Sequence, residues 1–312
     1  MQKILILGAC GQIGVELTLA LCEKWGNENV IASDIKEIHP LLENKCNYLN
    51  LDVLQKEQLR SKIQENKVTQ IYLLAAILSA TGEKNPPLAW KINMESLLNI
   101  LELAKEEKIE KVFWPSSIAV FGKNSPTQNT PQHTVIEPST IYGISKFAGE
   151  NWCAYYFEKY GVDVRSIRYP GLISYKSLPG GGTTDYAIDI FYKALSDKKY
   201  TCFLSENTFL PMMYMPDAIK ATIELMDAPK ENLSIRHAYN ISAMSFSPKT
   251  IAESIKKLIP EFSINYAPDF RQAIADSWPQ SIDDALAKKD WNWNADFDLE
   301  KMTADMIHHL SK

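Results

Sequence analysis

The 312-residue chain has no basic run longer than a pair, no closely spaced cysteine pair and no long apolar segment. Its 33 lysines and arginines are scattered and are outnumbered by 38 acidic residues, so the positive footprint of a nucleic-acid-binding protein is missing. No apolar stretch approaches the ~18 residues that a membrane helix requires. We therefore expect neither nucleic acid nor a membrane as a partner.

Cysteine and histidine are also sparse. The five cysteines include no Cys-x-x-Cys pair and are odd in number, which predicts free thiols in a reducing compartment. Among five histidines only His308 and His309 are adjacent, so no zinc site is expected. Because a core-like run, Ile4–Leu7, lies close to Met1, we expect no signal peptide and a cytoplasmic protein.

What the first half does contain is an alternation of short apolar runs and helical patterns, typical of βαβ units around a parallel sheet. The pattern predicts strands over residues 3–7, 30–33, 47–49, 70–75, 111–115 and 163–169. It predicts helices over residues 12–24, 56–65, 88–107 and 140–160. The fold class is therefore α/β, a doubly wound (Rossmann) parallel sheet.

A glycine loop follows the first predicted strand and opens the first helix. Gly8, Gly11 and Gly14 let the backbone turn tightly and approach a pyrophosphate at the helix N-terminus, with Gln12 and Ile13 in the same loop. The G-x-x-G-x-x-G spacing departs from the G-x-G-x-x-G fingerprint. Twenty residues after Gly14, Asp34 is placed to bind both adenosine ribose hydroxyls and to repel a 2′-phosphate. The cofactor expected is NAD rather than NADP.

Further cofactor contacts are expected where other strands end. After the third strand, Asp52 either reaches the adenine, beside Val53, or caps a turn. Asn93 either bridges backbone groups near the active site or lies exposed on its helix. The fourth strand ends with Leu74, Ala75 and Ala76. Small residues are expected there because the backbone would pass close to the cofactor.

The second half breaks the alternation with Gly180-Gly-Gly182 and scattered prolines. Helices are predicted over residues 185–196, 217–226 and 247–258. We expect an NAD-binding domain over residues 1–169, with 217–241 returning to it. Residues 170–216 and 242–312 would form a smaller C-terminal substrate-binding lobe.

Tyr142 and Lys146 lie four residues apart, so they share one helix face. A nearby ammonium lowers the pKa of a phenol, which lets it take a proton from an alcohol near neutral pH. Upstream, Ser116 and Ser117 end an apolar run. A dinucleotide site together with a Ser/Tyr/Lys set predicts an alcohol–ketone oxidoreductase.

These motifs resemble the extended short-chain dehydrogenase/reductase family over nearly the whole chain, and within it the L-threonine 3-dehydrogenases. The resemblance rests on four stretches of the chain, which are Leu73–Glu83, Trp114–Gly122, Arg168–Ser174 and Pro179–Ala187. The resemblance implies that Tyr142 is the base and that Lys146 also holds the nicotinamide ribose. It places Ser117 on the substrate hydroxyl, with Ser116 as a rival. It implies a nicotinamide pocket lined by Tyr169, Pro170 and Leu172.

For L-threonine as substrate, the β-hydroxyl would lose its proton to Tyr142 and a hydride to NAD, giving 2-amino-3-oxobutanoate without a metal. The carboxylate would meet free N–H groups at the start of the helix near residue 185, beside Ser79. In this loop, after Gly182, Thr183 or Thr184 would cap that helix. Asp185 would either attract the ammonium or serve the helix dipole, and Trp278 would either close the pocket or lie in the core.

Two other functions fit parts of the sequence. A nucleotide-sugar epimerase or dehydratase shares the chain length, Arg236 and Arg271. A non-catalytic NAD-sensing regulator shares the fold, although the intact Ser/Tyr/Lys set argues against it. The resemblance also implies a homodimer, in which the helices over residues 88–107 and 140–160 of two copies form a four-helix bundle.

Overall fold

The computed structural model describes residues 2–176, 178 and 180–312; Pro179, part of one stretch that carries the resemblance, lies outside them. Its centre is a six-stranded, all-parallel sheet. The spatial order is β3 (Asn47–Asn50), β2 (Val30–Asp34), β1 (Ile4–Leu7), β4 (Gln70–Leu73), β5 (Lys111–Phe113) and β7 (Val164–Arg165). This confirms the doubly wound α/β fold class, and the first five predicted strands are present with their ends within one or two residues of the prediction.

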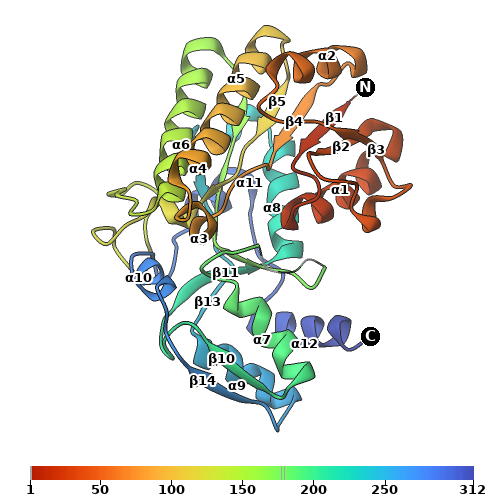
Figure 1. Cartoon of the computed structure of the whole chain (residues 1–312). Coiled ribbons are helices and arrows are strands. Elements are labelled where there is room, and N and C mark those ends of the chain that lie inside the picture. Colours follow the sequence, from red (N-terminus) through yellow and green to blue (C-terminus); the bar gives the residue numbers. More distant parts are fainter. Residues whose placement is uncertain (1, 177, 179) are drawn as a thin grey trace.

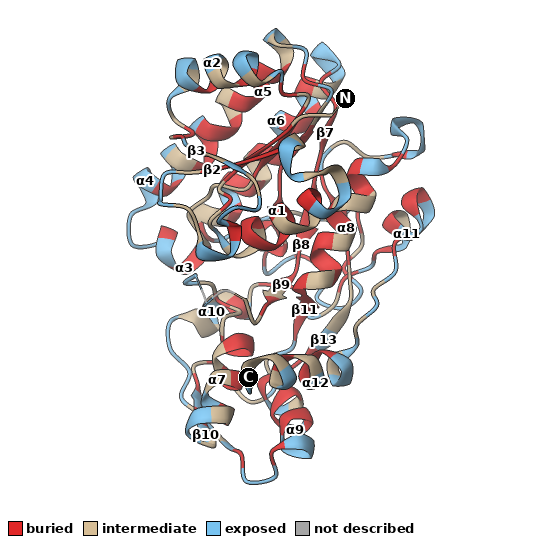
Figure 2. Ribbon diagram, turned by 90° about the vertical axis from the view of Figure 1, so that its right-hand side faces the viewer, coloured by how far each residue is buried: buried red, intermediate tan, exposed pale blue. Residues whose placement is uncertain are grey.

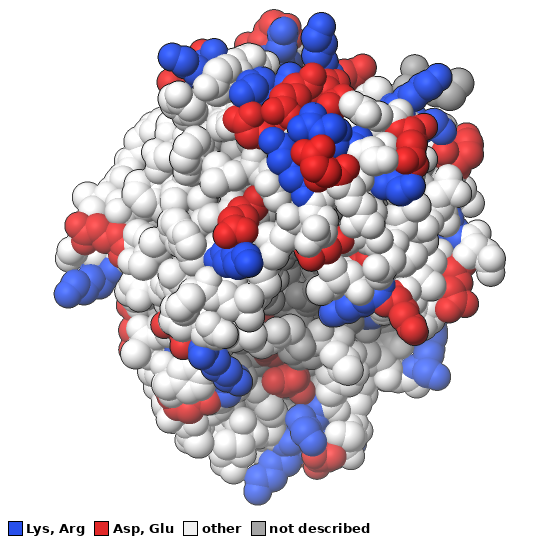
Figure 3. Space-filling model, turned by 45° about the horizontal axis from the view of Figure 1, so that its top comes forward, with Lys and Arg blue, Asp and Glu red and all other residues white. Residues whose placement is uncertain are grey.

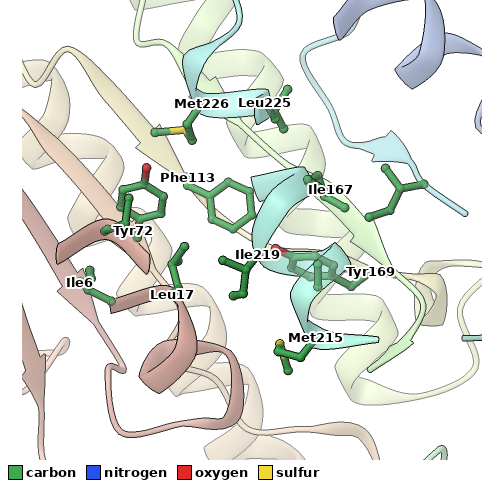
Figure 4. Close-up of a cluster of buried hydrophobic side chains, with 14 of the residues drawn as sticks. Ile6, Leu17, Tyr72, Phe113, Ile167, Tyr169, Met215, Ile219, Leu225 and Met226 are labelled. Atoms are coloured by element: carbon green, nitrogen blue, oxygen red, sulfur yellow. The ribbon is translucent and has the colours of Figure 1, made fainter. Parts of the chain in front are cut away.

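Alternate side chains of the sheet point into two separate cores. Ile4 and Ile6 of β1 pack with α1 (Gln12–Trp25) and α8 (Met215–Asp227). Figure 4 shows Ile6, Tyr72 and Phe113 of three neighbouring strands facing Leu17 and Ile219 of these helices. On the opposite face, Leu5 and Leu7 pack with α2 (Lys56–Asn66), α5 (Ser96–Glu106) and α6 (Ile141–Tyr160). The layers are visible in Figure 1, and Figure 2 shows burial concentrated between them.

The helix predicted over residues 88–107 has an internal irregularity. It consists of α4 (Pro86–Trp90), a π-helical segment (Lys91–Glu95) and α5. Asn93 lies in the π segment, and such bulges are frequent at functional sites. Before it comes the short α3 (Ser79–Gly82), and 3₁₀ turns span Asn27–Asn29, Pro40–Leu42, Ile118–Val120 and Lys230–Asn232.

The strand predicted over residues 163–169 changes partners half-way. β7 pairs with β5, whereas β8 (Ile167–Tyr169) lies between β6 (Ser116–Ser117) and β12 (Tyr239–Asn240). Residues 217–241 were expected to return to the NAD-binding domain. Helix α8 packs against β1 and α1 of that domain, and β12 pairs with β8. Trp291 and Trp293 also join the α1–α8 core.

The remaining elements pack around a third core at the lower end of Figure 1. Its helices are α7 (Tyr186–Ser196), α9 (Pro248–Leu258), α10 (Arg271–Ala275) and α12 (Leu299–Leu310). Helix α11 (Ala285–Trp291) instead packs in the α1–α8 core. β11 (Leu210–Tyr214) lies between β9 (Gly171–Ile173) and β13 (Met244–Phe246), and β10 (Lys199–Cys202) pairs with β14 (Ser263–Tyr266). The domain boundaries stay a prediction.

Acidic and basic side chains are interspersed on the face shown in Figure 3. No helix among the described residues is long and apolar enough to cross a membrane. The five cysteines are free thiols, and three of them are buried.

Candidate functional site

The glycine loop between β1 and α1 is built on close backbone contacts. Gly8 has a φ of 93°, and a Cβ there would lie 2.5 Å from the Ala75 nitrogen. A Cβ on Gly14 would lie 2.2 Å from the Gly8 carbonyl oxygen, so both positions require glycine. At Gly11 the nearest such contact is 3.4 Å, which leaves this residue open to an approaching ligand.

The start of α1 has the donors that a pyrophosphate needs. No side chain caps the helix at Gly11, so the first N–H groups of α1 are left for an anion. Gln12 adds a buried Nε2 that has no partner among the described residues. These free donors, together with the open Gly11, fit the diphosphate of a dinucleotide.

Asp34 at the end of β2 is tied to this loop. Its Oδ2 accepts a hydrogen bond from the Cys10 N–H at 3.0 Å, and its Oδ1 accepts one from the Lys36 N–H at 3.2 Å. The carboxylate is therefore fixed beside the glycine loop, as expected for a ribose-binding group. Asp52, in contrast, accepts the Leu54 N–H at 2.9 Å, which is the turn-capping alternative.

Ser117, Tyr142 and Lys146 line one pocket. Ser117 ends β6, Thr140 caps α6 through its hydroxyl, and the first two turns of α6 carry Tyr142 and Lys146. The Ser117 hydroxyl and the Tyr142 phenol both border this pocket, and Ser117 is close enough to affect the pKa of the phenol. The structure thus brings together three residues that lie up to 29 positions apart in the chain.

The charge relation between Tyr142 and Lys146 differs from the one expected. Burial raises the pKa of Tyr142 to about 12, and the nearby Ser117 hydroxyl opposes this rise. Lys146 donates to the Pro115 carbonyl oxygen at 2.6 Å, and its Nζ lies 4.4 Å from the centroid of the Trp114 ring. Burial lowers the pKa of Lys146 to about 7. The expected lowering of the phenol pKa by the nearby Lys146 is therefore not seen in the free protein, because burial dominates both groups.

The two serines of β6 point in different directions, as neighbours in a strand must. Ser116 is buried and donates to Glu150 Oε1 at 2.5 Å, whereas Ser117 is half-buried. The Ser117 Oγ also accepts the Ala119 N–H at 3.2 Å. With the Ser116 hydroxyl engaged elsewhere, Ser117 is the serine available beside Tyr142.

Asn93 is buried and its side chain bridges backbone groups. This agrees with the first of the two alternatives expected for it, and Asn93 is not exposed on its helix. It accepts the Ile77 N–H at 2.8 Å and donates to the Ile77 carbonyl at 3.1 Å. Its amide also donates to the Ser145 hydroxyl at 3.1 Å. Asn93 therefore joins the π segment, the chain after β4 and α6.

The far end of the pocket carries hydroxyl groups. The hydroxyls of Ser79 and Thr183 lie 3.4 Å apart, and both residues are buried. Neither Thr183 nor Thr184 caps α7, so that prediction is wrong: Asp185 occupies the cap position without a capping side chain. Instead, Asp185 Oδ2 accepts the N–H groups of Gly181 and Gly182 at 2.8 and 2.7 Å. It thereby holds the glycine turn in shape.

The pocket has a volume of about 220 Å³. Its walls include most of the residues expected for cofactor and substrate: Gly8, Gly11, Gln12, Ile13, Gly14, Leu74, Ala76, Ser79, Ser117, Tyr142, Lys146, Tyr169, Pro170, Leu172, Gly182, Thr183, Thr184, Asp185 and Trp278. Trp278 is buried and forms part of the wall. Expected residues that do not line it are Asp34, Asp52, Val53, Ala75 and Asn93.

Sequence reasoning missed several wall residues, among them Leu78, Pro115, Ile118 and Gly171. All four adjoin residues that were expected, so the neighbourhood of each motif held the signal. Among the described residues, no group of three or more His, Cys, Asp or Glu side chains is arranged to hold a metal ion.

A parallel sheet of this order with a glycine loop at α1 defines a dinucleotide-binding α/β enzyme. The chain belongs to the NAD dependent epimerase/dehydratase family, which it matches over residues 4–242. This confirms the resemblance to the extended short-chain dehydrogenases and NAD as cofactor.

Individual relatives cover nearly the whole chain. An uncharacterised epimerase/dehydratase of Staphylococcus haemolyticus is 47% identical over 316 residues, 100% of this chain and 98% of its own. The holo form of a GalE-like L-threonine dehydrogenase from Cupriavidus necator is 56% identical, with a TM-score of 0.96 and 99% of each chain covered. A monomeric L-threonine 3-dehydrogenase from a metagenome is 50% identical, with a TM-score of 0.95, covering 99% of this chain and 98% of its own.

Proposed function

We propose that this protein oxidises the β-hydroxyl of L-threonine to a ketone with NAD, giving 2-amino-3-oxobutanoate. The observation that carries the proposal is the pocket itself, in which Ser117, Tyr142 and Lys146 meet the hydroxyl pair of Ser79 and Thr183. The likeness to L-threonine dehydrogenases at 50% and 56% identity supports the same substrate.

Each residue of the set has one task in this reaction. Ser117 orients the substrate hydroxyl and donates to the oxygen as it becomes a carbonyl. Tyr142 takes the hydroxyl proton, and Lys146 supplies the positive charge that favours the phenolate. NAD supplies the hydride acceptor and, at its nicotinamide, a second positive charge. Gly8, Gly11 and the start of α1 hold its diphosphate.

Absorbance of reduced nicotinamide tests this function directly. Purified protein mixed with NAD and L-threonine should form the reduced cofactor, whereas nucleotide sugars should not react. An epimerase or dehydratase reaction is redox-neutral and leaves no net reduced cofactor. Conversion of a nucleotide sugar detected by chromatography, without reaction of threonine, would therefore support that reading, for which the Staphylococcus relative is named. NAD binding without any turnover would support a non-catalytic sensor.

Thr183 offers a test of substrate recognition. Its hydroxyl faces Ser79, so we propose that this pair of hydroxyl groups binds the carboxylate of threonine. Thr183→Val should raise the KM for threonine ~10-fold or more, as expected when a polar group of the substrate loses its partner, and should leave the KM for NAD unchanged. Steady-state kinetics measure both. If 1-amino-2-propanol, which lacks the carboxylate, reacts as well as threonine, the pocket does not recognise that group.

Asp34 should determine the cofactor preference. Asp34→Ala removes charge-assisted hydrogen bonds to the ribose and should weaken NAD binding by ~1–3 kcal/mol. It should also narrow the difference between NAD and NADP, because the repulsion of a 2′-phosphate disappears. Calorimetric titration with both dinucleotides measures the two effects. Equal affinity of the unaltered protein for NAD and NADP would show that Asp34 does not bind the ribose.

We also propose a homodimer built on α4 and α6. These two helices contact one another and expose five large apolar side chains at 39–45% of their surface, namely Leu88, Trp90, Ile144, Trp152 and Tyr155. Helices α4 and α6 lie side by side in Figure 1, and an apolar patch of this kind is typical of a face that pairs with a second copy.

A charge placed in this patch should disrupt the dimer. Trp152→Glu should convert the protein to a monomer in light scattering, whereas Phe270→Glu, 60% exposed in the other lobe, should leave the mass unchanged. A monomeric unaltered protein, as for the metagenome relative, would refute the dimer.

A further inference from the structure

Glu150 and Arg168 form a buried ion pair next to the Ser/Tyr/Lys set. Glu150 accepts two hydrogen bonds from Arg168, to Oε1 from Nε at 2.9 Å and to Oε2 from an η nitrogen at 2.7 Å. The side chains are 0% and 4% exposed. A bidentate pair of this kind is geometrically specific, and its burial is costly unless every polar atom is satisfied.

The pair is satisfied by groups from several segments of the chain. The second η nitrogen of Arg168 donates to the Gln132 carbonyl and to Asn240 Oδ1, both at 3.1 Å. Glu150 Oε1 also accepts the Ser116 hydroxyl at 2.5 Å. The network therefore joins α6, β6, β8 and β12 at fixed distances.

Two residues of the network, Ser116 and Glu150, adjoin residues of the Ser/Tyr/Lys set. Ser116 precedes Ser117 in β6, so a fixed Ser116 side chain fixes the direction in which Ser117 points. Glu150 lies four residues after Lys146 and eight after Tyr142 on α6, so the three share one helix face. Arg168 and Ser116 are paired residues of neighbouring parallel strands.

We propose that Glu150, held by Arg168, is a positioning residue for the Ser/Tyr/Lys set: it fixes Ser117 through Ser116 and provides the negative charge beneath Lys146. The proposal rests on the function proposed above for its activity readout. The groups around Lys146 are Glu150 and the Cys153 thiol on α6, Tyr142, the Trp114 ring and the Pro115 carbonyl. Burial has the largest effect on the pKa of Lys146 and lowers it, whereas Cys153 and then the Glu150 carboxylate raise it.

The test removes the charge while keeping the shape. In Glu150→Gln, Oε1 can still accept from Ser116, but the charge beneath Lys146 is lost. We expect kcat to fall ~10-fold or more, the size of effect of a displaced catalytic group, with Kd for NAD and KM for threonine within about twofold. The Lys146 signal in spectra of ¹³C-lysine-labelled protein, assigned with Lys146→Met, should titrate at lower pH than in the unaltered protein.

Because an unpaired Arg168 could prevent folding, Glu150→Gln/Arg168→Met provides a second variant without a buried unpaired charge. It should fold and show the same fall in kcat. Because the charge of Arg168 is removed as well, the Lys146 titration should shift in the same direction as in Glu150→Gln but by less.

The chain contains a matched control. Asp163 and Arg165 form a second buried pair at 2.8 Å, whose arginine donates to the carbonyls of Leu225, Met226 and Ala228 and which does not line the pocket. Asp163→Asn/Arg165→Met should lower stability at most and leave kcat and the Lys146 titration unchanged.

Three results would overturn the proposal: an unchanged kcat in the folded Glu150 variants, an unchanged Lys146 titration, or an equal loss of kcat in the control. If the unaltered protein does not oxidise threonine, the proposed function fails on its own, and the Lys146 titration still decides whether Glu150 acts on Lys146.

Discussion

Tyr142→Phe should reduce threonine oxidation by ~100-fold or more while NAD affinity stays nearly unchanged, the effect of losing a general base. The phenol lines the pocket together with Ser117 and Lys146, and phenylalanine keeps its packing there. Steady-state rates and calorimetric NAD titration measure the two quantities. A turnover equal to that of the unaltered protein would remove Tyr142 from the mechanism.

The same base has a signature in the pH dependence. Burial raises the pKa of Tyr142 to about 12, so the phenol is neutral at pH 7 in the free protein. The base works only when deprotonated, so the rate should rise with pH from neutral into the alkaline range. A bound nicotinamide would move this rise to lower pH, because its positive charge favours the phenolate.

A second tyrosine provides the control for this substitution. Tyr186, at the start of α7, is fully buried, and its hydroxyl has no partner among the described residues. Tyr186→Phe therefore removes a phenolic hydroxyl near the substrate loop without breaking a hydrogen bond. Its rate should stay within about twofold of the unaltered protein, since no interaction is lost.

The parts of the molecule that sequence reasoning predicted well are those with a strong period or a tight backbone requirement. β1 is a run of four buried residues, and Gly8 and Gly14 tolerate no Cβ. The strand and the glycine loop can therefore both be recognised in the sequence. The strands of the other lobe are as short as those of the central sheet, but they do not alternate regularly with helices. They were not predicted because they gain their stability from tertiary pairing.

Charge states could not be predicted from spacing alone. Tyr142 and Lys146 at i and i+4 suggested a low pKa for the phenol, but spacing does not reveal how deeply both groups are buried. The role of Asp185 was missed for a similar reason, since its bonds to Gly181 and Gly182 depend on the shape of the turn. Glu150 had a signal that was not used, its position one turn beyond Lys146 on the same face of α6.

Lys146→Met should abolish most activity and at the same time stabilise the fold. Lys146 is 2% exposed, and burial lowers its pKa to about 7, against ~10.4 for a free lysine. A gap of three to four units corresponds to ~4–5 kcal/mol, which the charged lysine costs the folded state. Methionine removes that cost but leaves the Pro115 carbonyl without its donor, a loss of ~1–3 kcal/mol. The net gain at pH 7 is therefore ~2 kcal/mol.

The pH dependence of this gain separates its cause from ordinary packing. Below about pH 7 both the folded and the unfolded chain bind the lysine proton, so the full cost is present. Between that pH and ~10.4 the unfolded chain binds more protons, so the unaltered protein gains stability as the pH rises and approaches Lys146→Met. Urea unfolding at pH 6.5, 8 and 9.5 measures this convergence.

Lys111→Met is the control, because the half-buried Lys111 also donates to a carbonyl, that of Met226, but lies outside the pocket. It should keep full activity. A Lys146→Met variant less stable than the unaltered protein at pH 6.5 would mean that the ammonium is not strained by burial, and that its bond to Pro115 outweighs the cost of removing it from water.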